Sequence, residues 1–317
     1  MIMTVSVFRQ FLECPAKALA TYKGKVLGDA SIVPEWNDEG SEAMACGSLC
    51  DAIVTKQIMI DENSVVTMPI LASWLASSYD DGNRSASWLL NKNGSFNAAA
   101  KTTIIAANKL LASQKAQALL SGSKYQVKLA AHIAGWDWEG TADIIKNSNG
   151  VLRVTDLKHP ASIKDDWIVQ YGKNVKVPYE QVWAYWFQLA FYRYALTEGS
   201  VVVDGVHHSA SDVFGEFNKI RNGLLVCTRE KVSQRKYIQL PNMVDSFLLA
   251  VAGKPIDGSG LTKLEAIRHI VDGTIEAPKC GNCDYCKSKS DVDVIDIENE
   301  EEIPFPAIDD KFGLNMV

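Results

Sequence analysis

Three charged side chains stand on two neighbouring segments that are otherwise apolar and rich in β-branched residues. Asp143 ends the segment GTAD, and Asp156 and Lys158 flank Leu157 in VTDLK. Buried charges are costly without partners, and two carboxylates that approach one another repel. The usual remedy is a hard divalent cation such as Mg²⁺, bound through oxygen together with waters and a phosphate. A nearby lysine can orient the attacking water or neutralise charge that develops on the phosphate.

The alternative for these three residues is a salt-bridged hairpin on the surface, because a D-x-K pattern alone is common. A second pattern favours the metal site. In the helix expected over residues 179–199, Gln188 and Tyr192 lie four positions apart and therefore project from one face. Their amide and hydroxyl could hold a phosphate or a water, although Tyr192 could also belong to an aromatic core stripe of the same helix. Together the two patterns indicate a site for a metal and a phosphate.

Four of the seven cysteines form another pattern. Cys280, Cys283 and Cys286 follow C-x2-C-x2-C spacing, and Cys14 stands far upstream, before Pro15. In a chain without a secretion signal this spacing indicates metal ligation before disulfides, because thiolates two residues apart converge on one soft ion or cluster. Cys14 is the candidate fourth ligand, and it would tie the two ends of the domain together. The alternative is a set of free thiols in a mobile C-terminal segment.

The composition is that of a globular chain with an acidic end. Of 317 residues, 47% are hydrophobic and 22% charged, which suffices for a full core. Residues 291–317 carry nine acids and one base, and subtracting this −8 from the total of −6 leaves +2 on residues 1–290. Phosphate binding depends on local charge, so a nucleic-acid partner is permitted. We expect one domain over 1–290 and a disordered acidic tail over 291–317.

The order of elements predicts a mixed α/β fold. Helical spacing covers residues 4–23, 41–60, 84–120 and 179–199, with Gly94 as a break, and two alternating strands flank the turn signal KNSNG at 146–150. Further strands and closing helices follow. Apolar runs are too short to span a bilayer, and the start lacks the apolar core of a signal peptide, so we expect a cytoplasmic protein with no membrane partner.

Taken in order, these motifs resemble the signature of the PD-(D/E)XK nuclease superfamily, specifically its RecB-like and exonuclease VIII (RecE-like) phage-associated branch. The resemblance runs from about residue 8 to residue 288 and includes the start FLECPAKA and the end CGNCDYCKS. It implies a restriction-endonuclease-like core, in which helices flank a mixed central sheet, with N-terminal helices and a C-terminal cysteine motif. It also implies a DNA exonuclease that uses Mg²⁺ or Mn²⁺ to resect duplex ends for recombination.

The resemblance assigns metal and catalytic roles by position. Asp143 and Asp156 match the acidic metal ligands, and Lys158 matches the motif lysine. The family also implies that the carbonyl of Leu157 reaches the metal. Relatives often carry a histidine where Asp51 stands, four residues after a helix glycine. Aspartate is a harder ligand, so Asp51 could substitute for the histidine, or it could mark a weakened second metal position.

The remaining matches concern the DNA strand. Gln188 and Tyr192 match the helix motif that lines the DNA backbone. Gln126 stands on the strand before Asp143, where some relatives place an acidic residue, and we expect it to have a minor role at most.

The cysteines and the partners follow from the same resemblance. In RecB-like and AddB-like nucleases, one cysteine before the core and three after it hold an iron–sulfur cluster, an order that this chain repeats with Cys14, Cys280, Cys283 and Cys286. Those relatives space the last pair more widely, so a [4Fe-4S] cluster and zinc are both open. The implied partners are duplex DNA ends, a RecT-like annealing protein and further copies of the chain. The competing functions are a non-catalytic DNA-binding or assembly protein that retains the fold, and an endonuclease.

Overall fold

The computed structural model describes residues 2–26, 41–56, 58–75, 82–163, 165–170, 173–178, 182–230, 233–253, 260–281, 283 and 286. The expected acidic tail, residues 291–317, lies outside the described residues. The chain divides into two compact units, one drawn from residues 39–132 and 137–244, the other from 1–38, 133–136 and 245–317. The single domain expected over 1–290 stays a prediction. Among the described residues, no helix combines the length and apolarity needed to cross a membrane.

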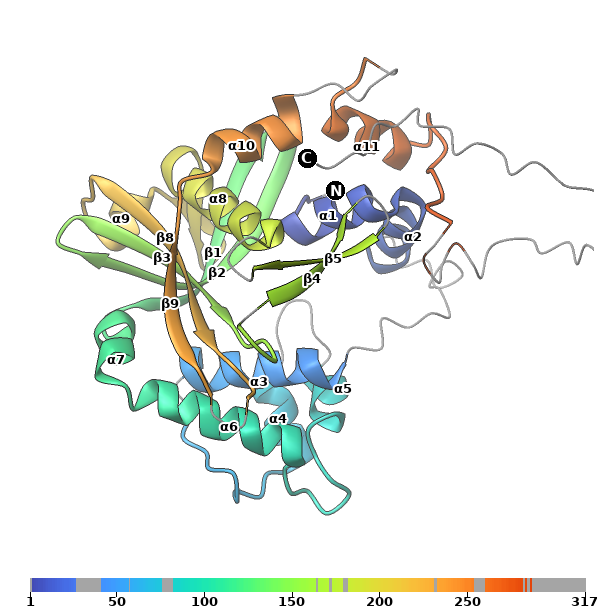
Figure 1. The fold of residues 1–317 in the computed structure, drawn as a ribbon. Coiled ribbons are helices and arrows are strands. Elements are labelled where there is room, and N and C mark those ends of the chain that lie inside the picture. The colour runs from blue at the N-terminus through green and yellow to red at the C-terminus, as the bar shows by residue number, and fades with distance from the viewer. Residues whose placement is uncertain are drawn as a thin grey trace, which may run out of the picture. The chain divides into compact units, whose positions relative to one another are not determined.

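A seven-stranded sheet forms the centre of the larger unit (Figure 1), in the order β7-β6-β1-β2-β3-β8-β9. Strands β3 and β8 pair in parallel, whereas β1 with β6, β2 with β3, β6 with β7, and β8 with β9 pair antiparallel. The predicted mixed α/β core is therefore confirmed. The strands are β1 (Lys124–Ile133), β2 (Trp136–Ser148), β3 (Val151–Lys158), β6 (Ser200–Val203), β7 (Val206–His208), β8 (Lys219–Cys227) and β9 (Arg235–Leu240).

The hairpin of β2 and β3 carries the charged residues and begins at the predicted turn. Asn149 and Gly150 both have positive φ, 52° and 75°, which is the backbone that a two-residue hairpin turn requires. Pairing then runs from Ser148 opposite Val151 to Ile144 opposite Thr155. This register brings Asp143 and Asp156 to the same end of the hairpin, away from the turn.

Helices cover both faces of this sheet. On one face α3, α4, α6 and α7 bury a large apolar cluster with Leu157 and Leu225 (Figure 1). On the other, α8 lies close enough for Leu189 to accept a hydrogen bond from Asn222. Asn222 and Leu225 lie three residues apart on β8, so their side chains face opposite sides. The helices are α3 (Glu42–Lys56), α4 (Met68–Leu75), α5 (Gly82–Ser87), α6 (Ala98–Leu111), α7 (Gln114–Leu120), α8 (Trp183–Glu198) and α9 (Ala210–Phe214).

The structure adds two details to the elements expected from the sequence. The helical region expected over 84–120 does break around Gly94, which has a φ of 79° and lies between α5 and α6. The part after this break is two helices, α6 and α7. The segment before α8, for which the sequence analysis named no element, contains a two-stranded ribbon of β4 (Asp165–Gln170) and β5 (Lys173–Pro178).

The smaller unit combines the two ends of the chain. Its helices are α1 (Val5–Glu13), α2 (Pro15–Val26), α10 (Val244–Leu248), a π-helical turn over Leu249–Gly253, and α11 (Lys263–Val271). The single helix expected over 4–23 breaks at Cys14, whose φ of −158° and ψ of 97° are extended. The following Pro15 disfavours helical backbone at Cys14, which explains the break. Ala16 donates a backbone hydrogen bond to Pro278, joining the N-terminal and C-terminal segments.

Gly140 on β2 should not tolerate a larger residue. A Cβ there would lie 2.8 Å from Cε1 of Phe191 and 3.0 Å from Cε1 of Tyr192, both buried on α8. We expect Gly140→Ala to lower the free energy of unfolding by about 1–3 kcal/mol, because overpacking forces the helix away from the strand. Urea denaturation measures this. As a control, Gly47→Ala on α3, where a Cβ meets nothing within 4 Å, should instead raise it by about 0.5–1 kcal/mol. Equal stability of the two variants would contradict this account.

Candidate active site

An open pocket of about 540 Å³ lies in the larger unit where α3, β2, β3 and α8 meet. Four of the charged residues singled out in the sequence line it, namely Asp51, Asp143, Asp156 and Lys158, and so does Gln188. Its remaining wall consists of Ala43, Met44, Gly47, Ser48, Leu157, His159, Pro160 and Tyr185. The pocket therefore combines a concentration of carboxylates with one lysine and an open side towards solvent.

Asp143 lies where β2 and β3 part. The pairing of the two strands ends at Ile144 and Thr155. Two residues further, the backbone N–H of Leu157 donates to Oδ2 of Asp143 at 2.7 Å. The carboxylate thus takes the place of a main-chain partner. Burial, followed by the nearby carboxylates of Asp156 and Asp51, raises the pKa of Asp143 well above its ordinary value. A bound cation would offset the same repulsion.

Asp156 and Lys158 form a close ion pair in the same pocket. Nζ of Lys158 lies 2.5 Å from Oδ2 of the buried Asp156. Burial alone lowers the pKa of Lys158, but the carboxylates of Asp156 and Asp143 outweigh it and raise the pKa above its ordinary value. Nζ also lies 5.1 Å from the ring centroid of Tyr185, a cation–π distance. The lysine is therefore held in its charged form.

Oxygen donors of the kind that Mg²⁺ and Mn²⁺ prefer are gathered in this pocket. Asp51, Asp143 and Asp156 supply carboxylates, and Leu157 lines the pocket beside them. Hard divalent cations bind carboxylate and carbonyl oxygens together with water, and an open side leaves room for water and a phosphate. The residues present thus fit the metal that the sequence motifs imply.

Gln126 was assigned a minor role at most, yet it contacts two of these carboxylates. Its Nε2 lies 3.0 Å and 3.2 Å from the two oxygens of Asp51 and 3.4 Å from Oδ1 of Asp143. Gln126 also has a φ of 50°, a backbone conformation uncommon outside glycine. Nothing in the local sequence signals such a conformation within a strand.

Gln188 and Tyr192 do lie together, but in different surroundings. Gln188 lines the pocket, whereas Tyr192 is buried behind it. The hydroxyl of Tyr192 accepts a hydrogen bond from Nε2 of Gln188 at 2.6 Å and donates one to the carbonyl of Thr141 at 2.6 Å. Tyr192 therefore ties Gln188 to β2. The sequence spacing correctly indicated a shared helix face but could not show that one hydroxyl serves the other side chain.

Tyr185 is a pocket residue that the sequence analysis did not single out. It lies three residues before Gln188 on α8, so both project from one face of the helix. That spacing could have found it. The neighbouring histidine, His159, is engaged by Cys227 and Thr103: its Nδ1 lies 2.5 Å from the carbonyl of Cys227 and its Nε2 lies 3.1 Å from Oγ1 of Thr103.

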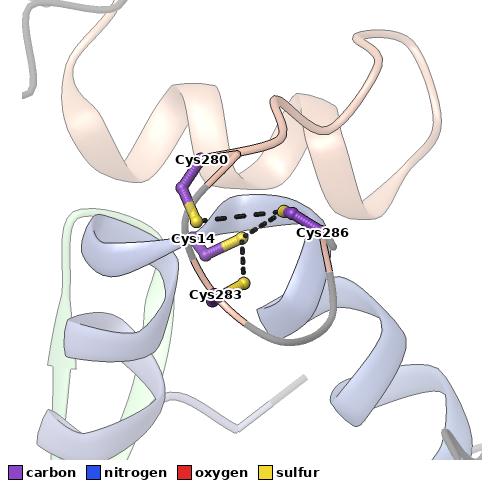
Figure 2. A group of neighbouring side chains, drawn as sticks. All are labelled: Cys14, Cys280, Cys283 and Cys286. Atoms are coloured by element: carbon purple, nitrogen blue, oxygen red, sulfur yellow. Dashed lines mark hydrogen bonds between the residues drawn. The ribbon is translucent and has the colours of Figure 1, made fainter. Parts of the chain in front are cut away.

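A second cluster lies in the smaller unit, where four cysteine sulfurs converge (Figure 2). The Sγ atom of Cys14 lies 3.5 Å from Sγ of Cys286 and 3.7 Å from Sγ of Cys283. The Sγ atom of Cys280 lies 3.8 Å from Sγ of Cys286. All four Sγ atoms lie within 4.8 Å of one another. Around a single zinc ion with Zn–S bonds of about 2.3 Å, tetrahedral geometry puts neighbouring sulfurs about 3.8 Å apart. The structure thus brings Cys14 to the C-x2-C-x2-C segment, as a shared metal would require.

The protonation of these thiols argues against a catalytic role. Burial raises the pKa of Cys14 to about 12, and burial also raises the pKa of Cys283. A reactive cysteine needs the opposite shift, because the thiolate is the nucleophile. The arrangement therefore suits a structural metal centre, in which the ion replaces the protons.

Comparison with known proteins agrees with this fold. A family described as "PDDEXK-like domain of unknown function (DUF3799)" matches residues 4–289. The crystal structure of a "putative exonuclease" from Eubacterium rectale superposes with a TM-score of 0.62 at 18% sequence identity, covering 95% of this chain and 94% of that one. No curated protein matches the chain. At this identity the structural likeness concerns the fold alone.

We expect the purified chain to hold one metal centre at the four cysteines and Cys283→Ser to lose it, because a tetrahedral thiolate site does not tolerate the loss of a ligand. Elemental analysis for zinc and iron measures the content. A broad visible absorption band identifies an iron–sulfur cluster and its absence identifies zinc. Cys46→Ala, a buried cysteine outside the cluster, is the control. Wild-type protein without either metal, or full metal in Cys283→Ser, would contradict the prediction.

Proposed function

Because the chain belongs to the PDDEXK-like DUF3799 family, within the PD-(D/E)XK nuclease superfamily, we propose that it is a DNA exonuclease that hydrolyses phosphodiester bonds at duplex ends with Mg²⁺ or Mn²⁺. One observation carries the proposal. Asp143, Asp156 and Lys158, three charged residues from two strands, line a single open pocket with Gln188. A structural salt bridge would need one acid and one base, and here three carboxylates and one lysine line the same pocket.

The carboxylates of Asp143 and Asp156 and the carbonyl of Leu157 would hold the metal, with Asp51 as the candidate for a further position. A divalent cation bound there would polarise the scissile phosphate and lower the pKa of a bound water. The chain's own contribution is to keep these oxygens together. The Leu157 amide fixes the carboxylate of Asp143, and Lys158 offsets the charge of Asp156.

Lys158 would act as a cation and not as a base. The neighbouring carboxylates raise its pKa, so the ammonium group keeps its proton at neutral pH. Its N–H groups can orient the attacking water and stabilise charge that develops on the phosphate oxygens in the transition state. The ring of Tyr185 stabilises the same cation from the α8 side.

Gln188 would position the DNA strand. Its amide faces the pocket and is tied to Tyr192, which in turn is tied to the Thr141 carbonyl on β2. The amide that would bind DNA is therefore fixed relative to β2, which carries Asp143. Tyr192 would act through Gln188, as a positioning residue.

The wider context is also part of the proposal. A nuclease of this branch would resect duplex ends in the cytoplasm for phage or prophage recombination, beside a RecT-like annealing protein and as a homo-oligomer. The four cysteines would stabilise the smaller unit by holding zinc or a [4Fe-4S] cluster, because a shared metal joins segments about 270 residues apart in sequence.

We expect the wild type to degrade end-labelled linear duplex DNA in Mg²⁺, and Lys158→Ala and Asp143→Asn each to lower the rate by at least about 10²-fold, because each removes charge stabilisation at the phosphate or the metal. Release of labelled nucleotides measures the rate. Lys219→Ala is the matched control, since Lys219 is exposed at the opposite end of the β3–β8 pair. A wild type that binds DNA without cutting it in either metal would favour the non-catalytic DNA-binding protein.

A covalently closed DNA circle distinguishes exonuclease activity from endonuclease activity. We expect linear plasmid DNA to be degraded and the same plasmid, covalently sealed, to stay intact, because an exonuclease requires a free end. Gel electrophoresis of both forms under identical conditions is the measurement. Cleavage of the sealed circle at a comparable rate would replace the exonuclease with an endonuclease.

A further inference from the structure

Gln126 bridges two carboxylates that come from different elements of the fold. Asp51 lies on α3 and Asp143 on β2, 75 residues before and 17 residues after the glutamine on β1. A single nitrogen, Nε2, reaches both oxygens of Asp51 and one oxygen of Asp143. The amide group therefore contacts both of these pocket-lining acids.

The backbone of β1 is distorted at the same residue. Gln126 has a φ of 50°, whereas a regular strand requires a negative φ, and a side chain other than glycine adopts this conformation at an energetic cost. One left-handed residue in a strand changes the direction of its side chain. Local distortion and a two-carboxylate contact thus coincide at one position.

The chemistry of the side chain explains what the contact achieves. The amide nitrogen of glutamine is a donor, and an ionised carboxylate is only an acceptor, so Gln126 can hold Asp51 and Asp143 near one another while both are charged. A carboxylate in its place would add a further negative charge and repel both. Hydrogen-bond donors of this kind orient metal-binding carboxylates, and their loss commonly weakens metal affinity.

We propose that Gln126 is a positioning residue that orients the carboxylate of Asp51 beside Asp143, so that Asp51 serves the same divalent cation site. The inference rests on the proposed function, since it assumes that this pocket binds Mg²⁺ or Mn²⁺. Asp51 would then be a ligand of the metal site, and the amide of Gln126 would hold its carboxylate in position. This positioning role also explains why a strained glutamine stands on β1.

Two substitutions separate this role from folding. Gln126→Asn keeps the amide on a side chain one methylene shorter, and asparagine tolerates positive φ. Gln126→Gly removes the amide and relieves the backbone strain, so both variants should be at least as stable as the wild type. Gln239→Asn, an exposed glutamine on β9, is the matched control.

The experiment is calorimetric titration of the full chain with Mn²⁺, with Asp143→Asn to identify the heat that arises in this pocket. We expect Gln126→Asn and Gln126→Gly each to weaken Mn²⁺ binding about 10-fold or more, and Gln239→Asn to match the wild type. In the nuclease assay the Mn²⁺ concentration for half-maximal rate should rise by the same factor, with the rate at saturating Mn²⁺ nearly unchanged.

The possible failures are distinguishable. Unchanged Mn²⁺ affinity in both folded Gln126 variants would overturn the positioning role while leaving the metal site in place. A wild type that binds no Mn²⁺ would overturn the metal site and the inference with it. A wild type that binds Mn²⁺ without cutting DNA would overturn the nuclease activity alone, and the Gln126 variants would then still decide the positioning role through affinity.

Discussion

Mutual repulsion among carboxylates at one end of the central sheet is the constraint on which the site depends. Asp51, Asp143 and Asp156 line one pocket, and the repulsion contributes to the raised pKa of Asp143. Three kinds of donor offset it, the Lys158 ammonium, the Leu157 backbone amide and the Gln126 side-chain amide. Each donor must lie within hydrogen-bond distance of a carboxylate. This requirement agrees with the separation of β2 and β3 beyond Ile144 and Thr155 and with the left-handed backbone of Gln126 on β1.

Helices packed on both faces of the mixed sheet hold these residues in place. Strand β3, which carries Asp156, pairs antiparallel with β2, which carries Asp143, and in parallel with β8. Gly140 allows α8 to approach β2 closely enough for Tyr192 to reach the Thr141 carbonyl. The same helix then presents Gln188 and Tyr185 to the pocket. One small residue thus sets the distance between the charged strands and the helix that faces them.

The smaller unit joins segments from the two ends of the chain. Cys14 is extended between α1 and α2 because Pro15 follows it, and this break lets its sulfur meet those of Cys283 and Cys286. A metal shared by distant segments removes far more conformational freedom from the unfolded chain than one shared by neighbours. Burial in this cluster raises the pKa of the Cys14 thiol.

The sequence by itself determined the parts that depend on local chemistry. Asn149 and Gly150 specify the hairpin turn, period-two alternation indicates the strands of the hairpin, and cysteine spacing indicates the cysteine cluster, because turn geometry and side-chain direction follow from neighbours along the chain. Tertiary structure decided the rest. The hydrogen bonds of Gln126 to Asp51 and Asp143 join residues 75 and 17 positions apart, and they come with a left-handed backbone at Gln126. The burial of Tyr192, which hydrogen-bonds Gln188, depends on close packing of α8 against β2. No local propensity encodes such contacts, since their energy arises only when distant segments are packed together.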